Sequence, residues 1–316
     1  MAEHVVGIIV LLFGGVMFIS ASNVDSSNTD ARKNGGEKTV LTSSAKAQES
    51  DAVLVGAGDI SSCDDLSGAE ATAKLIEKIP GTVFAAGDLA YPDGTDEQFA
   101  KCYNPTWGRF KDRTRPAPGN HEYHSDGASG YARYFGAISG DPKKGYYSYE
   151  LGGWHIVVLN SECAEVGGCD TASPQGQWLH EDLAQHPVTC TLAYFHKPLF
   201  SSGAKHGNDP LMKPLWDTLY NAGADVVVNG HDHDYERFAP QDPIGRADSL
   251  HGIREFVVGT GGKNHRLFAA PKPNSEARNA DTFGVLKLTL HAKSYDWQFI
   301  PEAGKAFTDS GSGDCH

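Results

Sequence analysis

The chain has 316 residues, of which 40% are hydrophobic and 21% charged, and its formal net charge is −13. These proportions are typical of a globular protein that can bury a sizeable core. The acidic balance argues against nucleic acid as a partner, because phosphate backbones attract basic surfaces. An acidic surface also repels anionic substrates, so a site for phosphate compounds needs local positive charge, such as metal ions.

The first residues have the character of a secretory signal. Val5–Ile19 is a continuous apolar run that is followed by small residues. The run is shorter than the roughly 20 residues of a membrane-spanning helix and suits the apolar core of a signal peptide. We therefore expect residues 1–22 to be a signal peptide and the protein to be secreted or periplasmic. Residues 1–4 contain no Lys or Arg, which leaves a retained membrane anchor as the alternative.

The cysteines agree with an exported protein. There are six, and none forms a C-x-x-C pair, which argues against a zinc ribbon or a thioredoxin-type site. An even number behind a signal peptide predicts disulfides, with buried free thiols as the alternative. We expect the pairs Cys63–Cys102, Cys163–Cys169 and Cys190–Cys315, of which the second closes a short loop that contains glycine.

Composition also indicates the domain organisation. Residues 23–50 are mostly small, polar or charged, and they have too few large apolar residues to offset the entropy of ordering, so we expect a disordered linker. Residues 51–301 alternate apolar runs with amphipathic segments and predict a single domain. Residues 302–316 are rich in Gly and Ser and predict a C-terminal tail held only by Cys315.

The pattern within residues 51–301 is α/β. Short apolar runs bounded by glycine predict buried strands at 52–55, 82–86, 154–159, 189–195, 225–228 and 255–258, and alternating runs predict half-exposed strands at 285–290 and 295–300. Apolar residues at helical spacing predict helices over 69–79, from 173 onward and over 210–222. Ser173 is a suitable N-cap for the second helix, with Pro174 in its first turn.

Polar residues follow the ends of several strands, in most cases directly after a glycine. The strands at 52–55, 82–86, 114–118, 189–195 and 225–228 lead into Asp59, Asp88, Asn120-His121, His196 and Gly230-His231-Asp232-His233. In open α/β sheets ligands bind outside the carboxyl ends of the strands, and glycine lets the backbone turn there. We expect these side chains to lie together at one edge of the sheet.

Each of these motifs alone is weak evidence, because a Gly-Asp pair after a strand is more often a turn and a lone histidine more often packs in the core or faces solvent. Their repetition at successive strand ends makes the structural explanation improbable. Carboxylates and imidazoles bind divalent transition metals. Two such ions roughly 3.5–4 Å apart can clamp a group that undergoes displacement at phosphorus.

At this point the sequence resembles the calcineurin-like metallophosphoesterases and, within them, the compact purple acid phosphatases. The family pattern appears in order as Gly58-Asp59, Gly87-Asp88-Leu89-Ala90-Tyr91, Gly119-Asn120-His121-Glu122, His196 and Gly230-His231-Asp232-His233, and the extension Asp234-Tyr235-Glu236-Arg237 resembles the purple branch. The resemblance covers about residues 53–237. It implies two packed mixed β-sheets flanked by helices.

The resemblance also implies a ligand set. Asp59, Tyr91 and His233 would hold the first metal, Asn120, His196 and His231 the second, and Asp88 would bridge both. Many relatives have a ligand His where this chain has Ser61, so Tyr91 would supply the missing ligand. A phenol with a pKa of about 10 needs a strong Lewis acid to ionise, which favours Fe(III) at the first site and Fe, Zn or Mn at the second. A packed aromatic at the rim is the alternative for Tyr91.

His121 is not needed as a ligand and is free to bind phosphate or protonate the leaving group. His206, ten residues after His196, resembles a second substrate histidine, with an exposed loop histidine as the alternative. The neighbouring Lys205 stands where plant members often have His.

The predicted activity is therefore hydrolysis of small-molecule phosphomonoesters, by attack of a metal-bound hydroxide at a dinuclear centre. A phosphodiesterase or nucleotidase on the same site and a catalytically inactive metal-binding module are the alternatives. No nucleic-acid partner and no membrane contact beyond the N-terminal anchor is expected, and the sequence does not determine the oligomeric state.

Overall fold

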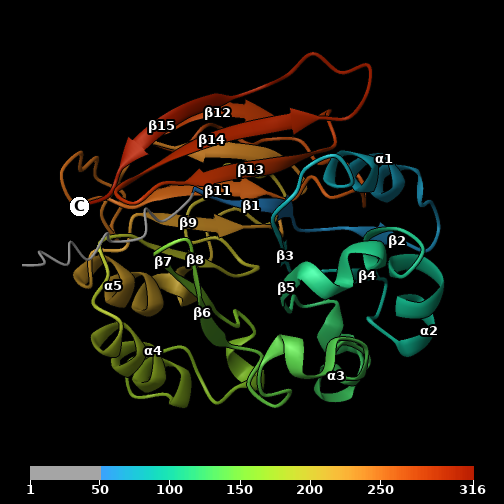
Figure 1. Ribbon diagram of the computed structural model, residues 1–316, viewed down its shortest axis with the longest axis horizontal. Helices are drawn as coiled ribbons and strands as arrows, with labels where there is room; N and C mark the ends of the chain where they lie inside the picture. Colours follow the sequence, from blue (N-terminus) through green and yellow to red (C-terminus); the bar gives the residue numbers. More distant parts are fainter. Residues whose placement is uncertain (1–50) are drawn as a thin grey trace, which may run out of the picture. The chain divides into compact units, whose positions relative to one another are not determined.

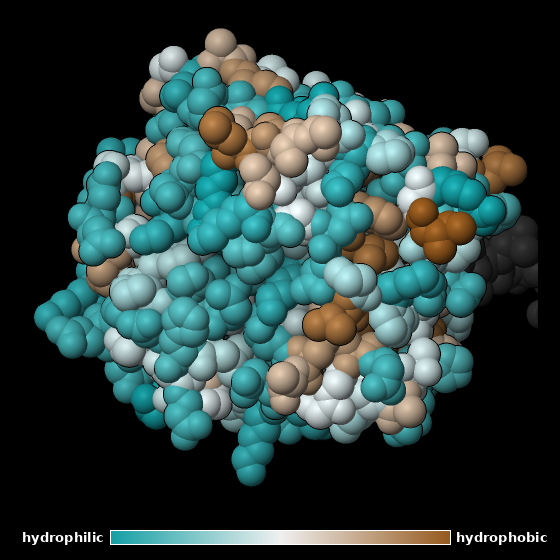
Figure 2. Space-filling model, turned by 180° about the vertical axis from the view of Figure 1, so that it is seen from behind, coloured by the Kyte–Doolittle hydropathy of each residue, from teal (hydrophilic) through white to brown (hydrophobic). Residues whose placement is uncertain are grey.

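The computed structural model describes residues 51–316. The predicted signal peptide (1–22) and linker (23–50) lie outside the described residues. Within the described part, no helix has both the length and the apolar character needed to cross a bilayer. On the face shown in Figure 2, hydrophilic side chains cover most of the surface and hydrophobic ones are scattered in small groups.

One sheet combines parallel and antiparallel strands. Its order is β15 (Ser310–Asp314), β14 (Ser294–Pro301), β13 (Gly284–Leu290), β1 (Ala52–Ala57), β3 (Thr82–Ala86) and β5 (Thr114–Ala117). The strands β1, β3 and β5 are parallel to one another, whereas β13 is antiparallel to β1 and continues into two antiparallel neighbours. The carboxyl ends of β1, β3 and β5 therefore lie at the same edge.

The second large sheet has the same mixed character. Its order is β12 (Ser275–Asn279), β10 (Tyr235–Phe238), β11 (Arg254–Val258), β9 (Val226–Asn229), β8 (Thr191–Tyr194), β7 (Trp154–Val158) and β6 (Tyr147–Leu151). The strands β7, β8, β9 and β11 are parallel. The strands β2 (Ser61–Ser62) and β4 (Ala90–Tyr91) form a separate short parallel pair. In the chain, β2 follows β1 and β4 follows β3.

The two large sheets pack face to face. Aromatic side chains cross the interface: the ring centroids of Phe84 and Tyr194 are 5.8 Å apart, and those of Phe256 and Trp297 are also 5.8 Å apart. Along β7, Ile156 faces this shared core whereas Val157 faces the helices on the other side. This alternation is the one expected of a strand buried on both faces.

Helices cover the outside of the sandwich (Figure 1). They are α1 (Ser67–Ile76), the single turn α2 (Asp96–Gln98), α3 (Ser129–Phe135), α4 (Pro174–Gln185) and α5 (Lys213–Asn221). The helices α4 and α5 bury Leu179, Trp216 and Leu219 against the second sheet. The Ser173 hydroxyl accepts a hydrogen bond from the backbone of Gly176, as an N-cap does. The predicted α/β fold of two packed mixed sheets flanked by helices is confirmed.

The three expected disulfides, Cys63–Cys102, Cys163–Cys169 and Cys190–Cys315, are all present. The prediction that residues 302–316 are held only by Cys315 is wrong, because β15 pairs with β14 along its whole length. Glycine makes this strand possible: a Cβ at Gly311 would lie 2.4 Å from the Trp297 ring, and one at Gly313 would lie 2.5 Å from the Tyr295 ring.

Candidate metal centre

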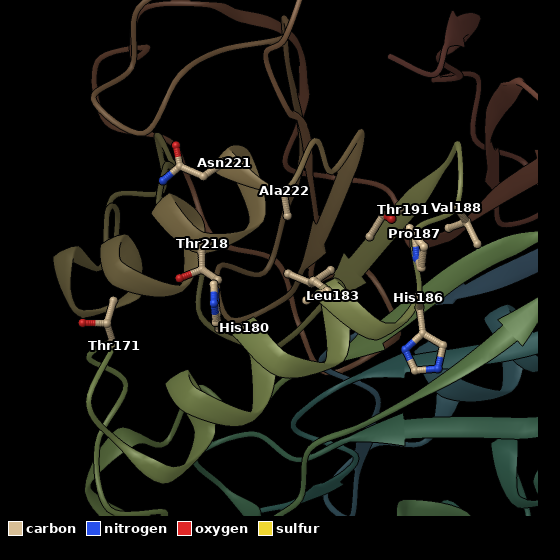
Figure 3. A pocket seen from close by; sticks show the side chains of 11 residues that line it. Thr171, His180, Leu183, His186, Pro187, Val188, Thr191, Thr218, Asn221 and Ala222 are labelled. Carbon is tan, nitrogen blue, oxygen red and sulfur yellow. The ribbon is translucent and has the colours of Figure 1, made fainter.

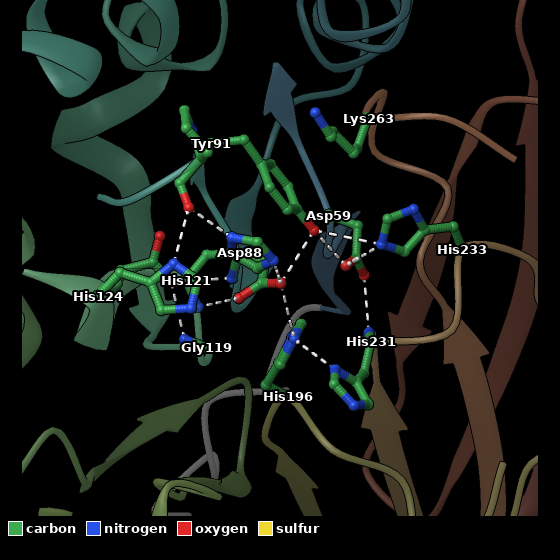
Figure 4. A network of polar contacts seen from close by, with 12 residues as sticks. Asp59, Asp88, Tyr91, Gly119, His121, His124, His196, His231, His233 and Lys263 are labelled. Carbon is green, nitrogen blue, oxygen red and sulfur yellow. Dashed lines mark hydrogen bonds and ion pairs between the residues drawn. The ribbon is translucent and has the colours of Figure 1, made fainter. Parts of the chain in front are cut away.

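The strand ends identified in the sequence meet at one place. Asp59 follows β1, Asp88 follows β3, His196 follows β8, and His231 and His233 follow β9. Asp59, Asp88 and His196 follow three different strands, and all three side chains are fully or almost fully buried. Figure 4 shows their polar ends converging between the two sheets, with the Tyr91 ring inserted from β4. The structure therefore brings together side chains that are far apart in the sequence.

Three of these residues have unusual backbone conformations. Asp59, Asp88 and His231 have positive φ angles of 59°, 55° and 72°. Residues other than glycine rarely adopt this left-handed region, and those that do are held by their surroundings and gather at functional sites. Here the backbone N–H of His231 donates to Asp59 Oδ2 at 2.7 Å, and that of Asp59 donates to the Gly87 carbonyl at 3.0 Å.

Glycine is required where the loops approach one another most closely. A Cβ at Gly119 would lie 2.2 Å from Asp88 Oδ1, and one at Gly87 would lie 2.5 Å from His196 Nδ1. Both distances are far below van der Waals contact. The glycines before the polar residues therefore allow the loops after β3, β5 and β8 to close on one another.

A first group of donors surrounds the Tyr91 hydroxyl. Its oxygen is 2.7 Å from Asp59 Oδ1, 2.9 Å from Asp88 Oδ2 and 3.3 Å from His233 Nε2. His233 Nε2 is also 3.1 Å from Asp59 Oδ1. One phenolic proton cannot serve three acceptors. This crowding of lone pairs is the arrangement expected of ligands that share a cation.

A second group lies on the other side of Asp88. His196 Nε2 is 3.2 Å from Asp88 Oδ2 and 3.1 Å from His231 Nδ1. The carbonyl oxygen of the Asn120 side chain is also buried, and within residues 51–316 it has no hydrogen-bond partner. A buried acceptor without a partner costs free energy, which binding of a cation to this oxygen would offset. Asp88 Oδ2 thus lies between the two groups, within reach of both.

Outer contacts set the orientation of the histidine rings. His196 Nδ1 is 2.9 Å from the Ala86 carbonyl, and His233 Nδ1 is hydrogen-bonded to the side-chain oxygen of Asn264. A carbonyl partner requires the proton to be on Nδ1, which leaves the lone pair of Nε2 free. Metal-binding histidines are held in this way.

Negative charge exceeds positive charge in the centre when only the protein is counted, because the pKa of both Asp59 and Asp88 is lowered. Burial lowers the pKa of His196, but the carboxylates of Asp88 and Asp59 outweigh burial and raise it to about 10. Burial raises the pKa of the Tyr91 phenol well above its ordinary value, and both carboxylates raise it further. The donor set and these charges fit cations.

The predicted catalytic histidines, His121 and His206, both line a pocket of about 200 Å³ together with Asp88, Asn120, His231 and His233. His121 Nδ1 is 2.5 Å from the Pro92 carbonyl, and its Nε2 is 3.8 Å from Asp88 Oδ2. The ring of His206 lies over that of His231, with centroids 3.9 Å apart. Burial, together with Arg266 and Lys205, lowers the pKa of His206 to about 4 although Asp232 opposes this shift.

A larger hollow of about 680 Å³ lies between α4 and α5 (Figure 3). Its lining is mostly apolar and aliphatic, and its titratable side chains are His180 and His186. No carboxylate is among the described residues that line it, although His186 lies close to His155 and Asp182, and the three could hold a metal ion. The smaller pocket is lined by five histidines together with Asp88, Lys205 and Arg266. Size alone therefore does not identify the functional site in this protein.

Sequence reasoning missed several residues of the centre. Asn264 and Arg266 follow β11 through the glycine-rich segment 259–262, which is the same strand–glycine–polar pattern that identified the other loops. Reading that strand to its end would have found them. His124 lies one turn after His121 and lines the same pocket. Glu122 was part of a recognised motif but had no predicted role.

Comparison with known proteins agrees with this geometry. A family model described as calcineurin-like phosphoesterase matches residues 53–235, more than half of the chain. Purple acid phosphatase 15 of Arabidopsis thaliana is 29% identical over 61% of this chain and 42% of its own length. Purple acid phosphatase 22 of the same plant is 29% identical over 67% of this chain and 52% of its own length. The chain thus spans about half the length of these relatives.

Solved structures agree on the fold. A purple acid phosphatase from yellow lupin seeds superposes with a TM-score of 0.66 at 20% identity, covering 84% of this chain and 54% of the lupin chain. GAP50 of Plasmodium, described as the anchor in the inner membrane complex, has a TM-score of 0.61 at 12% identity and covers 84% of this chain and 89% of its own.

Proposed function

Because the chain belongs to the calcineurin-like phosphoesterase family, in its purple acid phosphatase branch, we propose that it hydrolyses small-molecule phosphomonoesters with two metal ions. The observation that carries this proposal is the position of Asp88. Its Oδ2 lies 2.9 Å from the Tyr91 hydroxyl on one side and 3.2 Å from His196 Nε2 on the other. A carboxylate in that position supports a bridging role between two sites.

We assign Asp59, Tyr91 and His233 to the first metal and Asn120, His196 and His231 to the second. Cations at these positions supply Lewis-acid charge at phosphorus and activate water. Because burial and two carboxylates hold the Tyr91 proton firmly, only a strong Lewis acid displaces it, which favours Fe(III) at the first site. The imidazole and amide donors of the second site suit Fe, Zn or Mn.

The protein's own side chains then bind the substrate and move a proton. The Pro92 carbonyl accepts a hydrogen bond from His121 Nδ1, so that Nε2 faces the pocket. We assign His121 to protonation of the leaving oxygen, a role that needs a donor within hydrogen-bond reach of it. His206 Nε2 already accepts a hydrogen bond from Arg266 at 2.6 Å, so we assign His206 to binding a phosphate oxygen.

The catalytic unit that we propose is residues 51–301, with 302–316 as its C-terminal extension and with residues 1–22 and 23–50 as signal peptide and linker. The three disulfides support a secreted or periplasmic location, because disulfides persist in oxidising compartments.

The test is hydrolysis of p-nitrophenyl phosphate by the purified chain, before and after removal of metals and after their return. We expect activity that is lost with the metals and restored by iron together with zinc or manganese, and that is higher than on bis-p-nitrophenyl phosphate. A folded, metal-loaded chain without activity would instead indicate a metal-binding module. Higher activity on the diester would indicate a phosphodiesterase.

A further inference from the structure

One wall of the pocket carries positive charge that has no counter-ion. Lys205, His206 and Arg266 line it, and His121 and His124 line the same pocket. In the described part of the chain, neither Lys205 nor Arg266 forms an ion pair with a carboxylate, and the carboxylate that lines the pocket is Asp88 of the metal centre. Unpaired cations side by side are unexpected in a protein with a net charge of −13.

Arg266 is held firmly in this wall. Its backbone N–H donates to the His233 carbonyl at 3.0 Å. Its guanidinium Nη1 donates to His206 Nε2 at 2.6 Å and to the His231 carbonyl at 3.3 Å. The loop of Arg266 is also paired with that of Lys205, since the N–H of Ala204 donates to the Leu267 carbonyl at 3.0 Å. The guanidinium is therefore a preorganised cation and not a mobile surface charge.

Arg266 also lies one side chain farther out than the metal donors. The ring of His206 lies over that of His231, and the Arg266 guanidinium is hydrogen-bonded to Nε2 of His206. Among the residues that the structure describes, its Nε and Nη2 donate to no protein acceptor. A guanidinium with free donors in a planar fork is suited to bidentate binding of phosphate.

We propose that Arg266 and Lys205 form a second anion subsite, which makes the preferred substrates phosphomonoesters that carry another phosphate group on the leaving group. This inference rests on the proposed phosphomonoesterase function. The phosphate that is cleaved has the metal centre, His121 and His206 to bind it. Two more cations, of which Arg266 is held in place, match a second phosphate on the part of the substrate that leaves.

A simpler role for these cations is long-range attraction of every anionic substrate to an acidic protein. That role would raise the rate for all phosphate esters alike. A subsite instead discriminates between substrates with and without a second phosphate, so that a ratio of two substrates separates the explanations.

The experiment compares kcat/KM for fructose 6-phosphate and fructose 1,6-bisphosphate on the metal-loaded chain. We expect the wild type to prefer the bisphosphate at least about 10-fold, which corresponds to one charge-assisted hydrogen bond. Arg266→Ala should reduce the preference to about the twofold advantage of having two cleavable groups. Arg266→Lys should retain part of it, because a charge remains without the planar fork.

Lys293→Ala is the matched control for loss of one positive charge. Lys293 is exposed between β13 and β14, and this end of β13 pairs with the start of β1 (Ala52 with Leu290), at the far end of the strand from Asp59. We expect this variant to keep the wild-type preference. A wild type without preference, or an Arg266→Ala variant that slows both substrates equally, would overturn the subsite.

A binding measurement keeps the subsite testable if turnover fails. By calorimetry, methylenediphosphonate should bind the metal-loaded wild type more tightly than inorganic phosphate. In Arg266→Ala, the ratio of the two dissociation constants should fall by at least about 10-fold. An unchanged difference would overturn the subsite. Absence of turnover on any ester, with this difference intact, would count against the proposed function and leave the subsite standing.

Discussion

The carboxylate of Glu122 joins the loop of Asp88 to the loop of Gly119. Its Oε2 accepts hydrogen bonds from the backbone N–H of Asp88 at 2.9 Å and of Gly119 at 2.8 Å. Its Oε1 accepts from Leu89 at 2.8 Å and from Ala90 at 3.3 Å. Glu122 is fully buried. One side chain thus holds the two loops that supply the proposed bridging ligand and Asn120.

Glu122→Gln should therefore damage both stability and activity. The amide nitrogen would face two backbone donors, and leaving both unsatisfied costs about 2–6 kcal/mol. A displacement of the Asp88 loop by 1 Å is enough for roughly a 100-fold loss in kcat. Thermal unfolding and p-nitrophenyl phosphate kinetics measure the two effects. Glu97→Gln, at an exposed ion pair with Lys101, is the control, and equal behaviour of the two variants would contradict this role.

Tyr91→Phe tests the first metal site. The substitution removes the phenol oxygen that Asp59, Asp88 and His233 surround. We expect a visible absorption band in the iron-loaded wild type, its disappearance in the variant, and at least about 100-fold weaker retention of the first metal. Absorption spectra and metal analysis measure this.

Tyr103→Phe is the matched control, because Tyr103 is also fully buried but its hydroxyl has no hydrogen-bond partner among the described residues. It should keep the colour and the metal. A colourless wild type that contains only zinc and is fully active would contradict the assignment of Fe(III) to the first site.

The pair of His155 and Asp182 should make stability depend on pH. His155 Nε2 is 2.8 Å from Asp182 Oδ2, and Nδ1 is 2.7 Å from Glu150 Oε1. Burial lowers the pKa of His155, but the two carboxylates outweigh burial and raise it. Burial raises the pKa of Asp182, but its partners, His155 first, lower it overall.

A raised histidine pKa stabilises the fold fully below the unfolded value of about 6.5 and less as pH rises through the folded value. A lowered aspartate pKa contributes above about 4 and is lost as pH falls through the folded value. The Tm difference between wild type and His155→Gln should thus be largest between about pH 4 and 6.5 and shrink in alkali. His180→Gln, on the exposed side of α4, should show no such trend, and a difference that grows with pH would refute this account.

The sequence predicted much of the fold because buried parallel strands are continuous apolar runs with sharp ends. The strand predicted at 82–86 coincides with β3, and the one predicted at 285–290 differs from β13 by one residue. The strand β15 was missed because Ser and Gly in the segment Ser310–Asp314 favour loops. Pairing with β14 and contact with Trp297 and Tyr295 form that strand, and these partners are visible only in three dimensions.

The candidate site follows the same logic. Strand-end positions predicted that Asp59, Asp88 and His196 lie together, because ligands bind at the carboxyl ends of parallel strands. The expectation of one sheet edge was wrong, since β1 and β3 belong to the first sheet and β8 to the second. Glu122 belongs to a recognised motif, but its role could not be predicted because three of its four backbone donors lie 32 to 34 residues away. Arg266 shares the strand–glycine–polar pattern of the other loops, but its role depends on His206 and His231, which lie 60 and 35 residues away.

The most direct test of the central claim is kcat/KM for p-nitrophenyl phosphate in Asp88→Asn. Asparagine keeps the size of the side chain and the oxygen that accepts from the His121 backbone N–H, but it cannot supply the negative charge between the two donor groups. Asp64→Asn, at a highly exposed carboxylate, controls for loss of charge. The two-metal account predicts a fall of at least about 10³-fold for Asp88→Asn alone. Activity within about threefold of the wild type would contradict it.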